Sequence, residues 1–206
     1  MLFTLKVAFT NQQLETLYIT GTNVVIGKTS NGKTTPTVAW LVMKPFNQNI
    51  LTWEDEYGIY ISATPIQDGE IILKNSTTPI PVAESKLYTL QDSGVITGPL
   101  SGGTPNAFSL SNQYSDNPYM TCGIFQDATV NNIPVTGNCV FAEAVLLKNT
   151  AVLLPFVAAS IWLQSNIVSN TVVTTITSTV SPLLFGNGVA DISVAYDTAS
   201  GSFLPA

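Results

Sequence analysis

The sequence predicts an all-β protein made of two tandem, similar β-sandwich-like modules with approximate internal twofold symmetry. Threonine, valine, isoleucine and tyrosine are abundant, and glycine, proline and asparagine interrupt the chain every several residues, which is typical of short strands joined by turns. Short segments also recur about half a chain length later. The recurring pairs are Ile59-Tyr60-Ile61 with Ile161-Trp162-Leu163, Phe3-Thr4-Leu5 with Phe108-Ser109-Leu110, and Tyr18-Ile19-Thr20-Gly21 with Tyr119-Met120-Thr121-Cys122-Gly123.

Strands are expected wherever β-branched and aromatic residues lie between turn residues. In the first half these ranges are 3–9, 17–21, 23–27, 38–43, 58–63 and 70–74, with short strands at 86–90 and 95–97. In the second half they are 119–125, 139–147, 151–156, 159–164, 171–180 and 192–196. Range 171–180 alternates with period two, because Val172, Ile176 and Val180 share one face while threonine dominates the other. Helices longer than two turns are not expected.

The boundary between the modules is expected where turn residues concentrate. Segment 98–105 holds two prolines and three glycines and has no strand-forming residue at its centre. We therefore expect a first module at 1–98, a linker at 99–105 and a second module at 106–206.

The charge pattern excludes several classes of function. Charged residues make up 10% of the chain, the net charge is −6, and all seven basic residues are lysines, with no arginine and no histidine. Without a basic stripe or an arginine fork, nucleic-acid binding is not expected. Without histidine, the chain lacks the usual base of a nucleophilic triad and the usual ligand of zinc or iron. We expect no enzyme activity, no cofactor and no metal.

The cysteines and the N-terminus bear on the compartment. Cys122 and Cys139 are either two reduced, buried thiols or, in an oxidising compartment, a disulfide. The first residues lack the charged start, long apolar core and cleavage site of a signal peptide, so we expect a protein that is cytoplasmic or released without a recognisable signal peptide. The longest apolar run, 151–163, is too short for a membrane-spanning helix.

One segment matches the Walker A pattern, Gly27-Lys28-Thr29-Ser30-Asn31-Gly32-Lys33-Thr34. In a nucleotide-binding loop the amides around Gly32 would cradle phosphates, Lys33 would reach the β- and γ-phosphate oxygens, and Thr34 would hold magnesium. No alternation of strands and helices follows, and no arginine is available to stabilise transition-state charge. The simpler interpretation is an Asn-Gly turn joining strands 23–27 and 38–43, with nucleotide binding as a remote alternative.

A second segment, 53–58, places three consecutive carboxylates between a tryptophan and a tyrosine. Aromatic rings stack on the apolar faces of sugars while carboxylates accept hydrogen bonds from hydroxyl groups. The candidate ligand-binding residues are the stacking rings Trp53, Tyr57 and Tyr60 and the acceptors Glu54 and Asp55. The competing interpretation is a solvated charged loop that its two aromatic residues anchor to the core.

A third segment, 151–180, contains no charged residue. Uncharged strands that alternate valine or isoleucine with serine or threonine are able to insert into a bilayer as a transmembrane hairpin. The candidate inserting residues are Thr171, Val172, Val173, Thr175, Ile176 and Val180. The competing interpretation is an ordinary sandwich strand with an exposed threonine face.

These observations lead to a functional expectation mainly by exclusion. We expect a non-catalytic binding and self-associating protein, lectin-like or of a defence type, because its weakly charged surface suits hydrogen bonding to glycans or to further copies of the chain. A homo-oligomer or higher assembly is the expected state. The alternative is a membrane-active, pore-forming toxin that uses the uncharged region 151–180.

Overall fold

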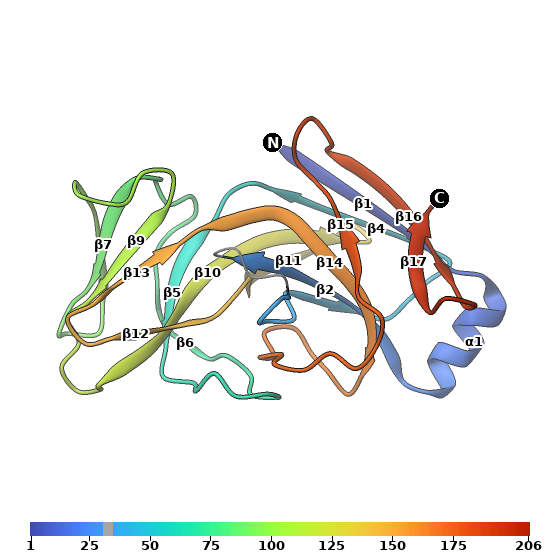
Figure 1. The fold of residues 1–206 in the computed structure, drawn as a ribbon, viewed down its shortest axis with the longest axis horizontal. Coiled ribbons are helices and arrows are strands. Elements are labelled where there is room, and N and C mark those ends of the chain that lie inside the picture. The colour runs from blue at the N-terminus through green and yellow to red at the C-terminus, as the bar shows by residue number, and fades with distance from the viewer. Residues whose placement is uncertain (31–34) are drawn as a thin grey trace.

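Strands form nearly all of the regular structure in the computed structural model, which describes residues 1–30 and 35–206 (Figure 1). The predicted all-β class is therefore confirmed. Strands β10 (Tyr119–Val130) and β14 (Pro155–Ser165) cross the middle of the molecule, and both chain termini lie on the same side of it. Helix α1 (Asn11–Ile19) lies at the end opposite β7 (Lys86–Leu90) and β9 (Phe108–Asn112).

The strands form three sheets. The largest has the order β17-β16-β1-β4-β10-β5-β6, and β11 and β12 also pair with β10. Besides β10, it contains β1 (Leu2–Ala8), β4 (Gln48–Glu54), β5 (Gly58–Ser62), β6 (Lys74–Thr77), β11 (Ile133–Cys139), β12 (Glu143–Leu146), β16 (Asp191–Asp197) and β17 (Ser202–Pro205). The second sheet, β13-β9-β7-β8, adds β8 (Ile96–Leu100) and β13 (Thr150–Leu153). The third, β15-β14-β2-β3, adds β2 (Thr22–Ser30), β3 (Leu41–Met43) and β15 (Ser181–Leu183).

Alternating side chains build the main core. Along β1, Phe3, Leu5 and Val7 are buried, while the residues between them are exposed or half-buried. Along β4, Leu51 and Trp53 are buried in the same cluster. This period-two pattern turns one face of each strand inward, because successive side chains of a strand point to opposite sides.

Each sheet draws strands from both sides of the expected 99–105 linker, so the two halves do not form separate sheets. In the largest sheet, β1 pairs in parallel with β16, which brings Thr4 beside Asp191. In the third sheet, β2 pairs with β14 along most of its length. The recurring segments also differ in structure, since 18–19 end a helix whereas 119–123 lie in β10.

Helix α1 replaces the strand predicted at 17–21. Thr10 caps the helix: its Oγ1 accepts a hydrogen bond from the Gln13 backbone N–H, and the Gln13 side-chain Oε1 accepts one from the Thr10 N–H. This reciprocal capping box stabilises the helix start. Leu14 and Leu17 then pack into the main core, which overrides the strand preference of the residues that follow.

The strand predicted at 171–180 is also wrong. Only isolated bridges occur there, at Thr171 and Val172. Thr171, Val172 and Val173 are buried one after another, which a two-faced strand does not allow. The exposed Asp68 carboxylate accepts hydrogen bonds from the backbone N–H groups of residues 174 and 175, which withdraws them from strand pairing.

Two further sequence expectations concern pairing and membranes. The pairing expected between 23–27 and 38–43 is confirmed, because β2 and β3 are antiparallel with Val24 opposite Met43 and Ile26 opposite Leu41. The expected turn residues Asn31 and Gly32 lie outside the described residues. Within residues 1–30 and 35–206, no helix has the length and hydropathy needed to cross a bilayer.

The packing around Gly123 on β10 can be tested by substitution. A Cβ atom added at Gly123 would lie 2.0 Å from the Phe141 carbonyl oxygen and 2.8 Å from the Tyr60 ring. Because a backbone oxygen cannot yield as a flexible side chain does, we expect Gly123→Ala to lower the free energy of unfolding by roughly 3 kcal/mol or more. Urea unfolding measures this change.

Gly69→Ala is the control, because Gly69 has a φ of +83° and a Cβ there would meet no atom within 4 Å. Its cost should be only that of a left-handed backbone, about 1–2 kcal/mol. Equal destabilisation by the two substitutions would contradict the close packing at Gly123.

Candidate functional site

Two polar residues occupy inward positions on strands of different sheets. Lys28 follows Val24 and Ile26 on the core-facing side of β2, and its side chain is 0% exposed. Gln126 lies between Ile124 and Ala128 on the core-facing side of β10 and is 1% exposed. The Lys28 Nζ donates a hydrogen bond to the Gln126 Oε1 at 2.6 Å. The two sheets are therefore joined by a polar contact inside an apolar core.

Aromatic rings enclose this contact. The Lys28 Nζ lies 4.4 Å from the ring centroid of Trp40, 5.0 Å from that of Trp53 and 5.7 Å from that of Tyr57. Ring faces attract a cation and so replace part of the hydration that burial removes. We call Lys28, Trp40, Trp53, Tyr57 and Gln126 the lysine cage.

Burial sets the protonation behaviour of the cage. It lowers the pKa of Lys28 to about 7, and the negative charge of the exposed Asp55 opposes this shift only in part. The amine is therefore substantially neutral near physiological pH. Burial, followed by the charge of Asp55, raises the pKa of Tyr57, so its hydroxyl stays protonated. The hydroxyl lies near the side chains of Asp55 and Gln126, although it meets no described residue in hydrogen-bond geometry.

The predicted sugar-binding residues are divided between the core and the surface. Trp53 and Tyr57 belong to the lysine cage, and Tyr60 is buried with its hydroxyl donating to the Phe141 carbonyl at 2.8 Å. Glu54 and Asp55 are exposed. The three rings therefore present no face to solvent on which a sugar could stack. They were expected as a surface platform, but alternation along β4 turns Trp53 inward, Tyr57 is buried just before β5, and Tyr60 lies in β5, where every residue is buried.

The other predicted sites also change place. Among the candidate membrane residues, Thr171, Val172 and Val173 are buried, Thr175 is exposed, and Ile176 and Val180 are half-buried against Val173 and its neighbours. For the nucleotide alternative, Gly32, Lys33 and Thr34 lie outside the described residues. The start of that motif, Gly27 to Ser30, belongs to strand β2 rather than to a loop.

Both cysteines are free thiols buried in the core. Cys122 packs in the main core and Cys139 in a smaller cluster around Tyr60 and Phe125. Burial raises the pKa of each thiol to about 12, because the thiolate would lose its hydration there. Among the described residues, no three histidine, cysteine or carboxylate side chains are grouped as metal ligands.

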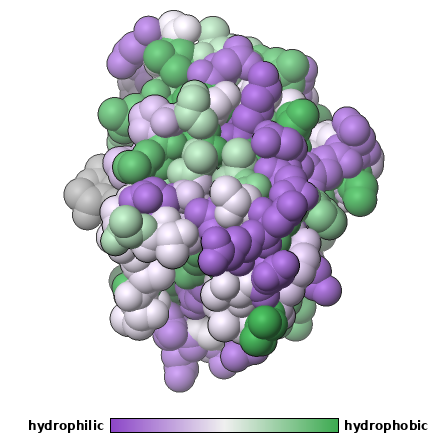
Figure 2. Space-filling view, turned by 90° about the vertical axis from the view of Figure 1, so that its right-hand side faces the viewer, coloured by the Kyte–Doolittle hydropathy of each residue, from purple (hydrophilic) through white to green (hydrophobic). Residues whose placement is uncertain are grey.

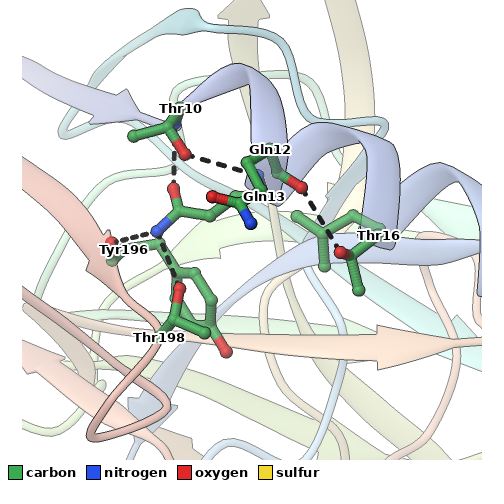
Figure 3. A pocket seen from close by; sticks show the side chains of 7 residues that line it. Thr10, Gln12, Gln13, Thr16, Tyr196 and Thr198 are labelled. Carbon is green, nitrogen blue, oxygen red and sulfur yellow. Dashed lines mark hydrogen bonds between the residues drawn. The ribbon is translucent and has the colours of Figure 1, made fainter.

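A hollow of about 380 Å³ lies between helix α1 and the end of β16 (Figure 3). We call it the polar pocket; it is lined by Thr10, Gln12, Gln13, Thr16, Leu17, Tyr196 and Thr198. None of these side chains carries a charge. Figure 2, which faces this end of the molecule, shows hydrophilic side chains across much of the surface with smaller apolar areas between them.

Two side chains of the polar pocket are held in place. The Gln13 Nε2 donates to the Tyr196 carbonyl at 2.9 Å and to the Thr198 Oγ1 at 3.0 Å (Figure 3). The Tyr196 ring packs against Phe9 and Phe203, with centroid distances of 6.0 Å and 5.3 Å. These contacts fix the amide of Gln13 and the ring of Tyr196, and a fixed site loses less entropy when a ligand binds.

Other groups of the polar pocket remain available. Neither the Gln12 side-chain amide nor the Tyr196 hydroxyl forms a hydrogen bond with another described residue, and the Thr198 hydroxyl still has a proton to donate. Sequence reasoning missed this pocket because its residues come from opposite ends of the chain. The capping box of Thr10 and Gln13 can be recognised in the local sequence. The sequence does not show that Tyr196 and Thr198, at the end of β16, lie beside it.

Sequence reasoning also missed the lysine cage. The signal was present, since Lys28 continues the inward series of Val24 and Ile26 and Gln126 interrupts an apolar series on β10. Comparison with known proteins adds nothing to either site, because no protein-family model, curated protein or solved structure matches this chain. Functional conclusions therefore rest on the geometry of the lysine cage and the polar pocket.

The buried thiols give a test of core packing. At pH 8 we expect Cys122 and Cys139 to react with a thiol-reactive disulfide reagent at least about 100-fold more slowly in the native protein than in denaturing urea, because thiolate is the reactive form. Release of the coloured reagent thiol measures the rate. Two rapidly reacting thiols in the native protein would contradict the burial of these residues.

Proposed function

We propose that this protein is a non-catalytic, lectin-like binding protein whose polar pocket takes a neutral sugar. The observation that carries the proposal is an uncharged hollow lined by the Gln13 amide, which hydrogen bonds hold in place, by several hydroxyl groups, and by the Tyr196 ring, which packs against Phe203. A volume of about 380 Å³ lies within the range of small-molecule pockets, roughly 300–1,000 Å³.

The chemistry of the lining favours a sugar over other small ligands. A sugar presents hydroxyl groups that donate and accept hydrogen bonds, which matches the Gln12 amide and the hydroxyls of Tyr196 and Thr198. Its C–H face packs on an aromatic ring, which Tyr196 supplies. The lining holds no cation to pair with a phosphate or carboxylate, and the net charge of −6 repels anions at longer range.

Self-association is the second part of the proposal. With 10% charged residues, the chain has little electrostatic repulsion between copies. The largest sheet also ends in β17 and β6, and apart from the Phe203 N–H, which donates to the Ser181 Oγ at 2.8 Å, the outer backbone groups of such end strands are able to pair with another chain. An oligomer would present several polar pockets together, and this multivalency would strengthen binding to a surface that displays many copies of one sugar.

Neutral glycan binding can be tested with point variants of the polar pocket. We expect the wild-type protein to bind neutral glycans on an array, and Tyr196→Ala or Gln12→Ala to weaken that binding about tenfold or more in calorimetry with the best free glycan. Tyr119→Ala is the matched control, because Tyr119 is an exposed tyrosine that does not line the pocket. Unchanged affinity in Tyr196→Ala would contradict the assignment of the site, and the absence of any glycan binding would contradict the function.

The oligomeric state is a separate expected outcome. Light scattering should give a mass that is a multiple of the 22.0 kDa chain at micromolar concentration. A single-chain mass at every concentration tested would contradict self-association without affecting the sugar site.

A further inference from the structure

The lysine cage is a feature that sugar binding does not use. It lies in the core rather than in the polar pocket, and it brings together two reactive functional groups from distant parts of the chain. Lys28 supplies a primary amine and Gln126 supplies a carboxamide, with 2.6 Å between the Nζ and the Oε1. The pairing of β10 with β11 also shifts register between Gln126 and Ala128, and such bulges often mark positions with a special role.

The contact helps to position the two sheets, but stability alone does not explain why a lysine rather than an apolar residue occupies this place. Burying an amine among apolar groups costs free energy unless it is fully paired, and apolar residues of similar size are often equally or more stabilising in such positions. Lys28 has one hydrogen bond to a neutral oxygen, together with its contacts to the three rings. Methionine would fill a similar volume at a lower cost of desolvation.

We propose that Lys28 and Gln126 form an intramolecular isopeptide bond that covalently joins the sheet of β2 to the sheet of β10. The Lys28 Nζ attacks the Gln126 side-chain carbonyl carbon, and a new C–N bond forms as the bond to the Gln126 Nε2 breaks. The attacking nitrogen loses a proton and the leaving nitrogen gains one, so a single molecule of ammonia departs. Atoms and charge balance without an oxidant or a further reactant.

The surroundings of the two groups favour this reaction. A fixed contact between amine and carboxamide makes the attack intramolecular, which removes much of the entropic barrier. Burial lowers the pKa of Lys28 to about 7, so the nucleophilic neutral amine is available at neutral pH. The Gln126 Nε2 donates to the Glu54 carbonyl at 2.5 Å, which fixes the plane of the carboxamide.

The surroundings also favour proton transfer to the leaving nitrogen and the stability of the new amide. The Tyr57 hydroxyl stays protonated and lies close to the Gln126 side chain, so it is placed to hydrogen-bond to the carboxamide while the leaving nitrogen takes up the proton that the attacking amine releases. The three rings exclude water from the site, which protects the new amide from hydrolysis. The product would also lose the desolvation cost of the buried amine, because an amide carries no charge.

Intact mass spectrometry of the denatured full-length chain tests the proposal directly. After incubation at pH 8, the wild-type protein should be lighter than its sequence mass by one ammonia molecule. Tryptic digestion should leave the chain uncleaved after Lys28 and should yield the peptide containing Lys28 joined to the peptide containing Gln126. The reaction should be slower at pH 5, because the amine of Lys28 is then mostly protonated.

Matched variants locate the bond. Lys28→Met and Gln126→Met each remove one reactant, and both should keep the full sequence mass. Lys74→Met is the control, because the Lys74 Nζ also lies over an aromatic ring, 4.8 Å from the ring centroid of Phe125, but Lys74 is exposed, and its variant should still lose ammonia. A wild-type chain that keeps its full sequence mass at pH 8 would overturn the proposal even if the variants fail to fold. A mass loss that persists in Lys28→Met would overturn it as well.

Discussion

The contact between Lys28 and Gln126 is the interaction on which the arrangement of the largest sheet and the third sheet depends. It occupies the centre of an apolar interface, where each side chain takes a place that alternation reserves for a hydrophobic residue. Because an unpaired amine or amide at this depth would cost several kcal/mol, β2 and β10 are held in the one relative position that satisfies both groups. The rings of Trp40, Trp53 and Tyr57 surround the Lys28 end of this contact in the core.

The contact of Lys28 with its surrounding rings explains why the sugar-binding platform predicted from the sequence does not lie on the surface. Trp53 and Tyr57 flank three carboxylates in the sequence, which suggested a sugar platform. In the structure the strand alternation of β4 carries Trp53 inward to Lys28 and leaves Glu54 outside, and Asp55 is exposed just after the strand ends. The carboxylates are exposed while the rings are buried, and the negative charge of Asp55 still partly offsets the lowering of the Lys28 pKa by burial and adds to the raising of the Tyr57 pKa by burial.

Local sequence patterns predicted those strands that can be recognised without knowing which strands they pair with. The strands at 86–90 and 58–63 were predicted within a residue of β7 and β5, because their apolar and β-branched residues are concentrated. Strand β4 was missed, since its acidic end resembled a loop, and α1 was missed although Thr10 and Gln13 form a capping box that the sequence shows. The pairing of β1 with β16 and the closure of the polar pocket depend on residues almost a chain length apart, and periodicity carries no information about such partners.

The direct test of this account is the accessibility of Lys28 relative to three of the exposed lysines, Lys6, Lys74 and Lys86. Native protein would be treated briefly with an amine-acylating reagent and digested, and the modified positions would be identified by mass spectrometry. Burial in the lysine cage predicts that Lys6, Lys74 and Lys86 are acylated while Lys28 stays unmodified. Acylation of Lys28 at the rate of Lys6 would contradict the cage, and with it the account of how the two sheets are joined.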